Sequence, residues 1–403
     1  MPAVPHRRAA ALRWAAVVAG TALLVTAALT GRPAWSAGGS SSPGEDVQQV
    51  LARAAASADV PFTGTATSSG ALGLPDLPRL GDVAALVGES TRTRTWWQSE
   101  QIWRTDVLTA TGERGLYASG GQLTGWDYER DALTTGAPLT GARLPRASDL
   151  LPPALARSLL AGSTPDAAAS RAGGLGERVV AGRLADGVRL RPDAQEADLS
   201  TVDHADLWVD RATGLPLAVD VVDVVGGPVA ASSFDRVVLG DPDRAALAVP
   251  APQGATVRSA ETDVAAGAAT AAPWLLPSEL AGLPALQDPS SAGAVAYGTG
   301  LLRLAVVSLP VDQGRQALRA AGAAGADPLE PSAQSPAGAA DEPTGGAETA
   351  LVRAGALSAA VVVVPGSRDD GGGRAYLVSG AVQPELLSRA AEQLTTDPPE
   401  RRP

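Results

Sequence analysis

Hydrophobic and polar residues alternate most clearly between Glu89 and Asp127. Large or β-branched side chains occupy every second position there, and turn clusters at residues 99–100, 111–112 and 120–121 divide the stretch into runs of strand length. Alternation with a period of two, interrupted by such clusters, is typical of consecutive antiparallel hairpins. The pattern therefore predicts a β-meander with one apolar face, which either packs as core or is open to a ligand.

Side-chain types predict how the first two strands of this meander pair. We place Gln98 opposite Ile102, because this register matches residues on both faces of the hairpin. The matched pairs are Trp97–Trp103 and Thr95–Thr105 on one face, and Arg94–Asp106 and Trp96–Arg104 on the other. Aromatic pairs, Thr pairs, opposite charges and cation–π contacts stabilise such ladders. A slip of one residue would lose the Arg94–Asp106 match.

Other periodic segments predict further helices and strands around the meander. The expected helices are Asp46–Ser57, Leu150–Ala161, Gln313–Ala321 and Pro384–Leu394. The expected strands are Phe62–Ser69, Glu177–Gly182, Gly187–Pro192, Val202–Val209, Leu215–Val225, Val229–Leu239, Ala294–Gly298, Leu301–Leu309, Ala350–Pro365 and Arg374–Gly380. A helical turn is also possible at residues 82–87, and residues 162–176 form a polar gap without a predicted element.

Composition divides the chain into two expected domains. A Gly/Ser linker at 38–44 precedes the first domain, 45–258, and an Ala/Thr/Gly-rich linker at 259–273 follows it. The second, smaller domain spans 274–396 and ends in a tail, 397–403. Its segment 322–346 is acidic, rich in Pro and Ala, and almost free of large apolar residues, which predicts a disordered loop.

The first 37 residues have the features of an export signal. A basic start with Arg7, Arg8 and Arg13 precedes the uncharged apolar run Trp14–Leu29, and the small residues around Ser36 suit a cleavage site. The run is shorter than the roughly 20 residues of a membrane-spanning helix. A cleaved signal peptide and a retained membrane anchor both stay open, and both place the body of the protein outside the cytoplasmic membrane.

Missing residue types exclude several kinds of chemistry. The 403-residue chain has no Cys and no Lys. It therefore lacks a disulfide, a thiol nucleophile and a lipid-attachment cysteine, and also a Walker A lysine and a Schiff base. A net charge of −11 makes the chain a poor binder of nucleic acid. No motif implies a cofactor.

His204 is the only His after the export segment, so a His-dependent hydrolase would have to use it. No G-x-S-x-G elbow is present, and Asp203 and Asp206 fall on different faces of the expected strand. We expect a surface or edge-strand His and no catalytic residue. A His-based metal site is excluded by count, and the acidic run 193–206 lacks the glycine and spacing of a calcium loop.

Several motifs of the chain resemble the actinobacterial LolA-like envelope proteins. In the first domain they are Phe62–Gly64, Gly70–Pro78, the Trp residues 96, 103 and 126, Val180–Arg183 with Val188–Pro192, and Leu207–Asp210 with Gly214–Leu217. In the second domain Ala294–Leu304, Arg353–Gly355 and Tyr376–Gly380 resemble the small second domain of the RseB/MucB sigma-E regulatory proteins. The resemblance covers most of residues 45–395, and its motifs are structural rather than catalytic.

The resemblance implies an α+β fold: a LolA/RseB-like open antiparallel half-barrel packed on helices, plus a smaller α+β domain. It implies an exported, non-catalytic envelope protein that binds a lipid or a lipoprotein-like acyl ligand and acts as a regulator or sensor. The implied partner is the extracytoplasmic part of an anti-sigma factor or another membrane protein. The alternative is a LolA-type lipoprotein or lipid carrier without a regulatory partner.

Five residues are the candidates for lining such a ligand cavity. They are Trp97, Trp103, Val107, Trp126 and Trp208. Burial of a Trp is favourable by a few kcal/mol in either role, so each Trp could equally belong to an ordinary core. The segment Gly70–Pro78 is either a lid at the rim of the cavity or a simple crossover.

Overall fold

The structure is a computed structural model. It describes residues 47–70, 90–108, 112–136, 146–250, 256–259, 274–286, 289, 293–323, 326, 346–366, 373–397 and 399–400. The expected export segment, the first linker, the Gly70–Pro78 segment beyond its first residue and the expected turn at 82–87 lie outside these residues. So do most of the second linker and most of the expected loop at 322–346.

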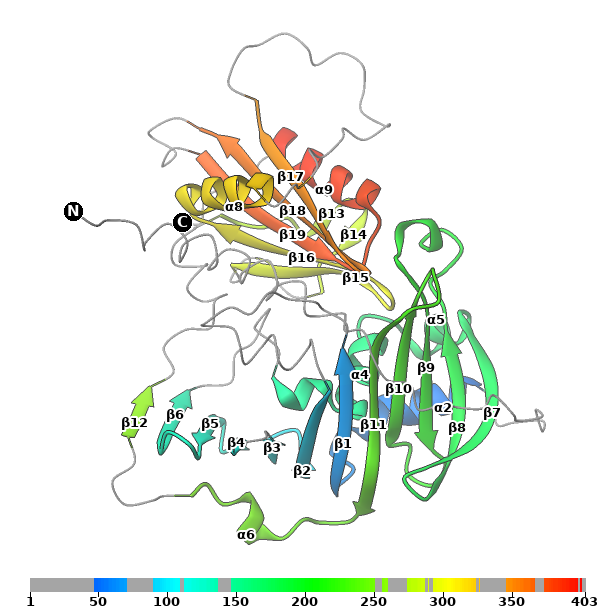
Figure 1. Cartoon of the computed structure of the whole chain (residues 1–403). Helices are drawn as coiled ribbons and strands as arrows, with labels where there is room; N and C mark the ends of the chain where they lie inside the picture. Colours follow the sequence, from blue (N-terminus) through cyan, green and yellow to red (C-terminus); the bar gives the residue numbers. More distant parts are fainter. Residues whose placement is uncertain are drawn as a thin grey trace.

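One large open sheet of twelve strands forms the first part of the molecule (Figure 1). Its strand order is β12-β6-β5-β4-β3-β2-β1-β11-β10-β9-β8-β7, and every pairing is antiparallel except that of β12 with β6. The strands are β1 (Phe62–Gly70), β2 (Thr91–Ser99), β3 (Ile102–Leu108), β4 (Glu113–Ser119), β5 (Gln122–Asp127), β6 (Ala132–Gly136), β7 (Ala172–Val180), β8 (Arg183–Leu190), β9 (Val202–Asp210), β10 (Pro216–Asp223), β11 (Pro228–Leu239) and β12 (Thr256–Ser259). Consecutive hairpins therefore build most of the sheet, as the alternation predicts.

The first hairpin of the meander has the predicted side-chain pairs. Trp97 lies opposite Trp103, Thr95 opposite Thr105, and Arg94 opposite Asp106. The end of the hairpin differs from the prediction, because Ser99 and not Gln98 lies opposite Ile102. A bulge between Trp97 and Ser99 absorbs one extra residue just before the turn, so the pairs further along the strands keep their register.

Helices cover one face of the large sheet, which we call the helix-side face. Helix α2 (Val47–Ala55) and helix α4 (Pro152–Leu160) pack on it, and the short α5 (Pro165–Ala169) packs against α2. Val50 and Leu51 of α2 and Ala156 of α4 are buried together with Leu207 and Val219 of the sheet. Pro152 and Pro153 begin α4, where a missing N–H is tolerated.

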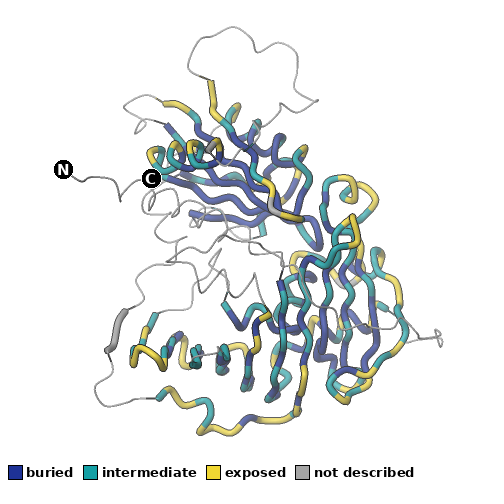
Figure 2. Tube along the Cα trace, in the orientation of Figure 1, coloured by how far each residue is buried: buried dark blue, intermediate teal, exposed yellow. Residues whose placement is uncertain are grey.

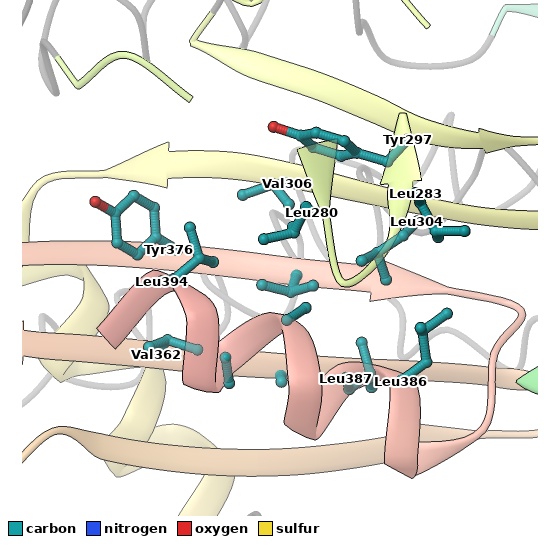
Figure 3. Close-up of a cluster of buried hydrophobic side chains, with 14 of the residues drawn as sticks. Leu280, Leu283, Tyr297, Leu304, Val306, Val362, Tyr376, Leu386, Leu387 and Leu394 are labelled. Carbon is teal, nitrogen blue, oxygen red and sulfur yellow. The ribbon is translucent and has the colours of Figure 1, made fainter. Parts of the chain in front are cut away.

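The second sheet has five strands in the order β15-β16-β19-β18-β17. Its strands are β15 (Ala294–Thr299), β16 (Leu302–Leu309), β17 (Glu348–Ala354), β18 (Leu357–Pro365) and β19 (Gly373–Gly380). Helix α9 (Pro384–Thr396) and the hairpin β13–β14 (Glu279–Leu280, Leu283–Pro284) pack on one face, as Figure 3 shows. Helix α8 (Val311–Ala323) packs on the opposite face of this sheet, where its Ala317 is buried together with Val361 and Leu377. Strand β16 is buried throughout and strand β18 over all but its last two residues, because both faces of the sheet are covered (Figure 2).

Two further predictions about secondary structure are wrong. The polar gap at 162–176 contains α5 and the start of β7, and Thr164 begins α5 by accepting a hydrogen bond from the backbone N–H of Ala167. The expected strand Ala350–Pro365 is two strands, because Gly355 takes a positive φ of 61° and turns the chain. With these changes, the expected α+β architecture of one large open antiparallel sheet on helices and one smaller sheet domain is confirmed.

Candidate functional site

A row of stacked aromatic rings crosses the helix-side face of strands β1, β2 and β3. Trp97 lies 6.2 Å from Phe62 and 5.8 Å from Trp103 between ring centroids, with interplanar angles of 8° and 9°. Cross-strand register causes this stack, because Phe62 faces Trp97 and Trp97 faces Trp103. Phe234 adds an edge-on contact to Phe62 at 5.3 Å. We call Phe62, Trp97 and Trp103 the aromatic row.

The polar atoms of the aromatic row are all bonded to the backbone. Trp97 Nε1 donates to the carbonyl oxygen of Ala58 at 2.8 Å, and Trp103 Nε1 donates to that of Glu100 at 3.1 Å. Helix α4 adds the guanidinium of Arg157, 5.5 Å from the Trp97 ring centroid. Both indole N–H groups of the row are therefore bonded, and its rings are buried.

Threonines continue the helix-side face beyond the aromatic row. Thr95 and Thr105 lie opposite each other, are fully buried, and share a hydrogen bond of 3.2 Å between their hydroxyl oxygens. Thr93 donates its hydroxyl to the carbonyl oxygen of Ala66 at 3.3 Å. Because these hydroxyls are bonded within the sheet, the groups that the threonines leave unbonded on this buried face are their methyl groups.

The side chains of β1 on this face are short. Gly64, Ala66 and Ser68 follow Phe62 at every second position and are buried. A Cβ at Gly64 would lie 2.9 Å from the carbonyl oxygen of Arg236 and 3.1 Å from the Phe234 ring. The rim of Phe234 therefore occupies the place where a side chain of residue 64 would be.

The structure places the five predicted cavity residues in different surroundings. Trp97 and Trp103 stack in one buried cluster. Trp208 is half-buried and lies opposite Gly187 and Ala218, on the other face of β9 from Leu207, with the guanidinium of Arg178 4.0 Å from its ring centroid. Val107 is half-buried on the helix-side face, two residues along β3 from Thr105. Trp126 pairs with Gly115 on the opposite face, where its ring meets Tyr128 edge-on at 5.3 Å. Trp126 therefore does not share a face with Trp97 and Trp103.

The opposite face of the meander holds a buried charge network that sequence reasoning found only in part. Asp106 is fully buried and accepts hydrogen bonds from Arg104 at 2.7 Å and Arg94 at 3.4 Å. Glu113 of β4 accepts from the same two arginines, at 3.0 and 2.8 Å. Glu113 was missed because its place depends on the register of the third strand, which carries no matched pair in the sequence.

Burial sets the protonation behaviour of this network. Desolvation raises the pKa of Asp106 to about 6, although Arg104 opposes the shift. Glu113 is more exposed; despite some desolvation, hydrogen bonding to Asp106 and the charges of Arg94 and Arg104 hold its pKa below the usual range. The two carboxyl groups therefore lose their protons at different pH values, Glu113 first.

Cation–π contacts complete the network. The guanidinium groups of Arg94 and Arg104 lie 4.9 and 4.6 Å from the Trp96 ring centroid, and that of Arg104 lies 4.9 Å from Tyr117. Arg104 also donates to the carbonyl oxygen of Ala246 at 3.2 Å, which ties the segment that follows β11 to this face. Arg104 therefore contacts Trp96 as predicted and also links the sheet to that segment.

The expectation that His204 is a surface or edge-strand residue is wrong. Its strand β9 lies between β8 and β10, and its side chain is half-buried. Strand β9 pairs with β8 on one side and with β10 on the other. The sequence pattern predicted strands over residues 187–190 and 216–222 but not the order of the strands in the sheet. His204 Nδ1 contacts Asp203 at 2.5 Å, and Arg189 and Arg191 bind the neighbouring acids Asp206 and Asp203. Within the described ranges, no group of three or more His, Asp or Glu side chains is placed to bind a metal ion.

Comparison with known proteins gives no match to any protein-family model and none to any curated protein. Solved structures do align with the chain. The complex of MucA and MucB from Pseudomonas aeruginosa aligns at 20% identity and a TM-score of 0.44, over 86% of this chain and 97% of that chain. LprF from Mycobacterium bovis aligns at 12% identity and a TM-score of 0.30, over 54% and 100%.

A third structure is the LolA superfamily protein NE2245 from Nitrosomonas europaea. It aligns at 11% identity and a TM-score of 0.22, over 51% of this chain and 99% of that chain. MucB and the LolA superfamily are the two groups that the sequence motifs resemble. Separately, none of the helices in the described ranges has both the length and the apolar character needed to cross a membrane.

Proposed function

We propose that the protein is an exported, non-catalytic envelope protein that binds an apolar ligand, a lipid or the acyl part of a lipoprotein, on its helix-side face. The observation that carries the proposal is the make-up of this face around Val107. The stacked rings and the threonine methyl groups make this face apolar. The side chains of β1 on the same face are short, so they occupy little volume. Contact with such a surface contributes about 0.8 kcal/mol per buried methylene of a ligand.

A regulator or sensor is favoured over a simple carrier by the second domain. A carrier needs only the large sheet, whereas here Leu301, Leu357 and Ala381 of the small domain are part of the buried cluster beneath α2 and α4. The proposed partner is the extracytoplasmic part of an anti-sigma factor or another membrane protein. MucB, with which this chain aligns, has been solved in complex with MucA.

Native mass spectrometry of the purified protein, followed by lipid extraction, tests the ligand. Adjacent residues of β3 offer a matched pair of variants, since Val107 and Leu108 are both half-buried but lie on opposite faces. Val107→Asp should lose the bound lipid, whereas Leu108→Asp should keep it. Lipid-free wild-type protein that takes up no added lipid, or equal loss in both variants, would contradict the proposal.

Localisation needs a separate test, because export does not depend on the ligand. Cell fractionation with an antibody to the small domain should find the protein outside the cytoplasm. A full-length protein found only in the cytosolic fraction would contradict export and leave the ligand test unaffected.

A further inference from the structure

Three turns at one end of the small sheet meet the large domain. They are the β15–β16 turn around Leu301, the β17–β18 turn at residues 355–356, and residues 381–383 between β19 and α9. Leu301 and Ala381 are 2% and 1% exposed and belong to the same cluster as Val50 and Leu207 of the large domain. The small domain thus completes a core of the large one. Figure 1 shows the β15–β16 end of the small sheet next to the large domain.

Backbone hydrogen bonds fix one side of this joint. The N–H of Thr201 donates to the carbonyl oxygen of Ala381 at 3.1 Å, and the N–H of Gln383 donates to that of Leu199 at 2.8 Å. These bonds form a β-bridge between Ser200 and Val382. The hydroxyl of Thr201 also donates to the carbonyl oxygen of Ala356 at 2.6 Å. Register across the joint is therefore as specific as within a sheet.

Arg303 fixes the other side. Its side chain leaves β16 and reaches the end of helix α4, where Nη1 donates to Ser158 Oγ at 3.1 Å and Nη2 donates to the carbonyl oxygen of Ala161 at 2.9 Å. The residue is only 8% exposed. Among the described residues, no carboxylate forms an ion pair with it, so the negative end of the α4 dipole and these two acceptors stabilise its charge.

Glycines let the two backbones come this close. Gly162, directly after the Ala161 carbonyl, has a φ of 79°, and a Cβ there would lie 2.7 Å from Leu286 and 3.0 Å from Thr299 of the small domain. Gly300, on the opposing turn, has a φ of 59°, and its Cβ would lie 2.7 Å from Arg171. A side chain at either position would force a side chain of the other domain to move.

We propose that Arg303 is a cationic latch between the two domains: by gripping the carboxyl end of α4 inside an otherwise apolar joint, it makes the two domains one rigid body. Burial lowers the pKa of Arg303 to about 10, so the group stays charged at neutral pH. A buried guanidinium without a carboxylate partner is stable only while both of its neutral acceptors remain hydrogen-bonded to it. The latch is therefore geometrically demanding, and loss of Arg303 frees the joint to move.

Helix α4 carries the latch toward the aromatic row. Arg157, next to Ser158, lies over the Trp97 ring, so a shift of the small domain on α4 acts on a residue that touches the row. The latch itself does not depend on any ligand, and it holds or fails whether or not the helix-side face binds a lipid.

Distance measurement between two spin labels tests the latch in the full chain. Because the chain contains no Cys, Ala212→Cys in the β9–β10 turn and Arg319→Cys on α8 place one label on an exposed site of each domain. With Arg303 present, one narrow distance distribution is expected. Arg303→Met should at least double its width, while the matched variant Arg374→Met, at the far end of β19, should leave it unchanged.

Two results would overturn the latch: a broad distribution with Arg303 present, or a folded Arg303→Met protein with an unchanged width. Folding is checked by circular dichroism and the melting temperature. If Arg303→Met does not fold, Ser158→Ala takes its place, since it removes one of the two acceptors of Arg303 and leaves Arg303 itself in place. A wider distribution then supports the latch, and an unchanged one refutes it.

Discussion

Arg104 holds Asp106 through two parallel contacts, with Nε and Nη2 each 2.7 Å from a different carboxylate oxygen. Bidentate pairs of this kind are geometrically specific. The pair nevertheless lies where Asp106 has no contact with solvent, so desolvation outweighs the attraction and raises the pKa of the carboxyl to about 6. Burial of this carboxylate therefore costs stability at neutral pH, and the contact with Arg104 offsets only part of that cost.

We predict that Asp106→Asn gains stability relative to the wild type as the pH rises. The unfolded carboxyl releases its proton near 3.8 and the folded one near 6, so between these values the folded state binds more protons. Stability of the wild type then falls with rising pH by on the order of 1 kcal/mol per unit, a loss that the Asn variant does not have. Urea unfolding at pH 4, 5, 6 and 7 measures the difference.

Glu113 shares Arg94 and Arg104 with Asp106, and its lowered pKa depends partly on Asp106, so the same comparison in a Glu113→Gln background separates its contribution. A difference between wild type and Asp106→Asn that stays constant from pH 4 to 6, or that changes in the opposite direction, would contradict the prediction.

The stability that Asp210 contributes should depend on pH in the opposite direction from that of Asp106. Burial opposes its ionisation, but hydrogen bonds from Arg183 at 2.7 Å and from Thr213 hold its pKa below the usual range. A lowered pKa gives stability that is present above the unfolded value and disappears as the pH falls through the folded one. Asp210→Asn should therefore be destabilised at pH 7 by about 1–3 kcal/mol, since it loses a charged acceptor.

The destabilisation by Asp210→Asn should shrink as the pH falls below 4. Unfolding of the two proteins at pH 7 and pH 3 measures it, and a penalty that is the same at both values would show that the pairing charge is unimportant. Thr213→Val is the matched control, because it removes one neutral donor and leaves the ion pair in place.

Sequence patterns predicted contacts within a hairpin better than contacts between hairpins. Trp97–Trp103 and Arg94–Asp106 could be predicted because only one register matches residue types on both faces. Glu113 joins the same network from β4, and no pair of residue types in the sequence fixes that third strand. Gln98 was misplaced because a bulge adds one residue without changing the alternation that precedes it.

Glycine-rich strands were the other source of error. The start of β7 contains Gly173, Gly174 and Gly176, which have low strand propensity, and tertiary pairing with β8 overrides it. Thr164 followed by Pro165 is a helix-start signal that could have revealed α5. The reach of Arg303 to α4 spans two domains, and nothing in the local sequence indicates it.

Gly64→Ala should destabilise the large sheet by about 1–3 kcal/mol, because the new Cβ would meet the backbone oxygen of Arg236 at 2.9 Å and force Phe234 to move. Gly125→Ala is the matched control on β5, where nothing lies closer to the new Cβ than 3.9 Å. Its stability should stay within about 1 kcal/mol of the wild type or rise slightly, since Ala restricts the unfolded chain. Equal effects of the two substitutions in urea unfolding would show that the close approach at Gly64 is relieved without energetic consequence.

Neighbouring Trp residues on β2 offer a test of the two faces of the meander. Trp97 is 7% exposed and stacks on two rings, so Trp97→Ala should cost about 3–5 kcal/mol of unfolding free energy. Trp96 is half-buried between Arg94 and Arg104, where Trp96→Ala loses mainly cation–π contacts and should cost about 1–2 kcal/mol. Chemical unfolding followed by circular dichroism measures both. If Trp96→Ala were the more damaging change, the charged face rather than the aromatic row would be the one on which the fold of the meander depends.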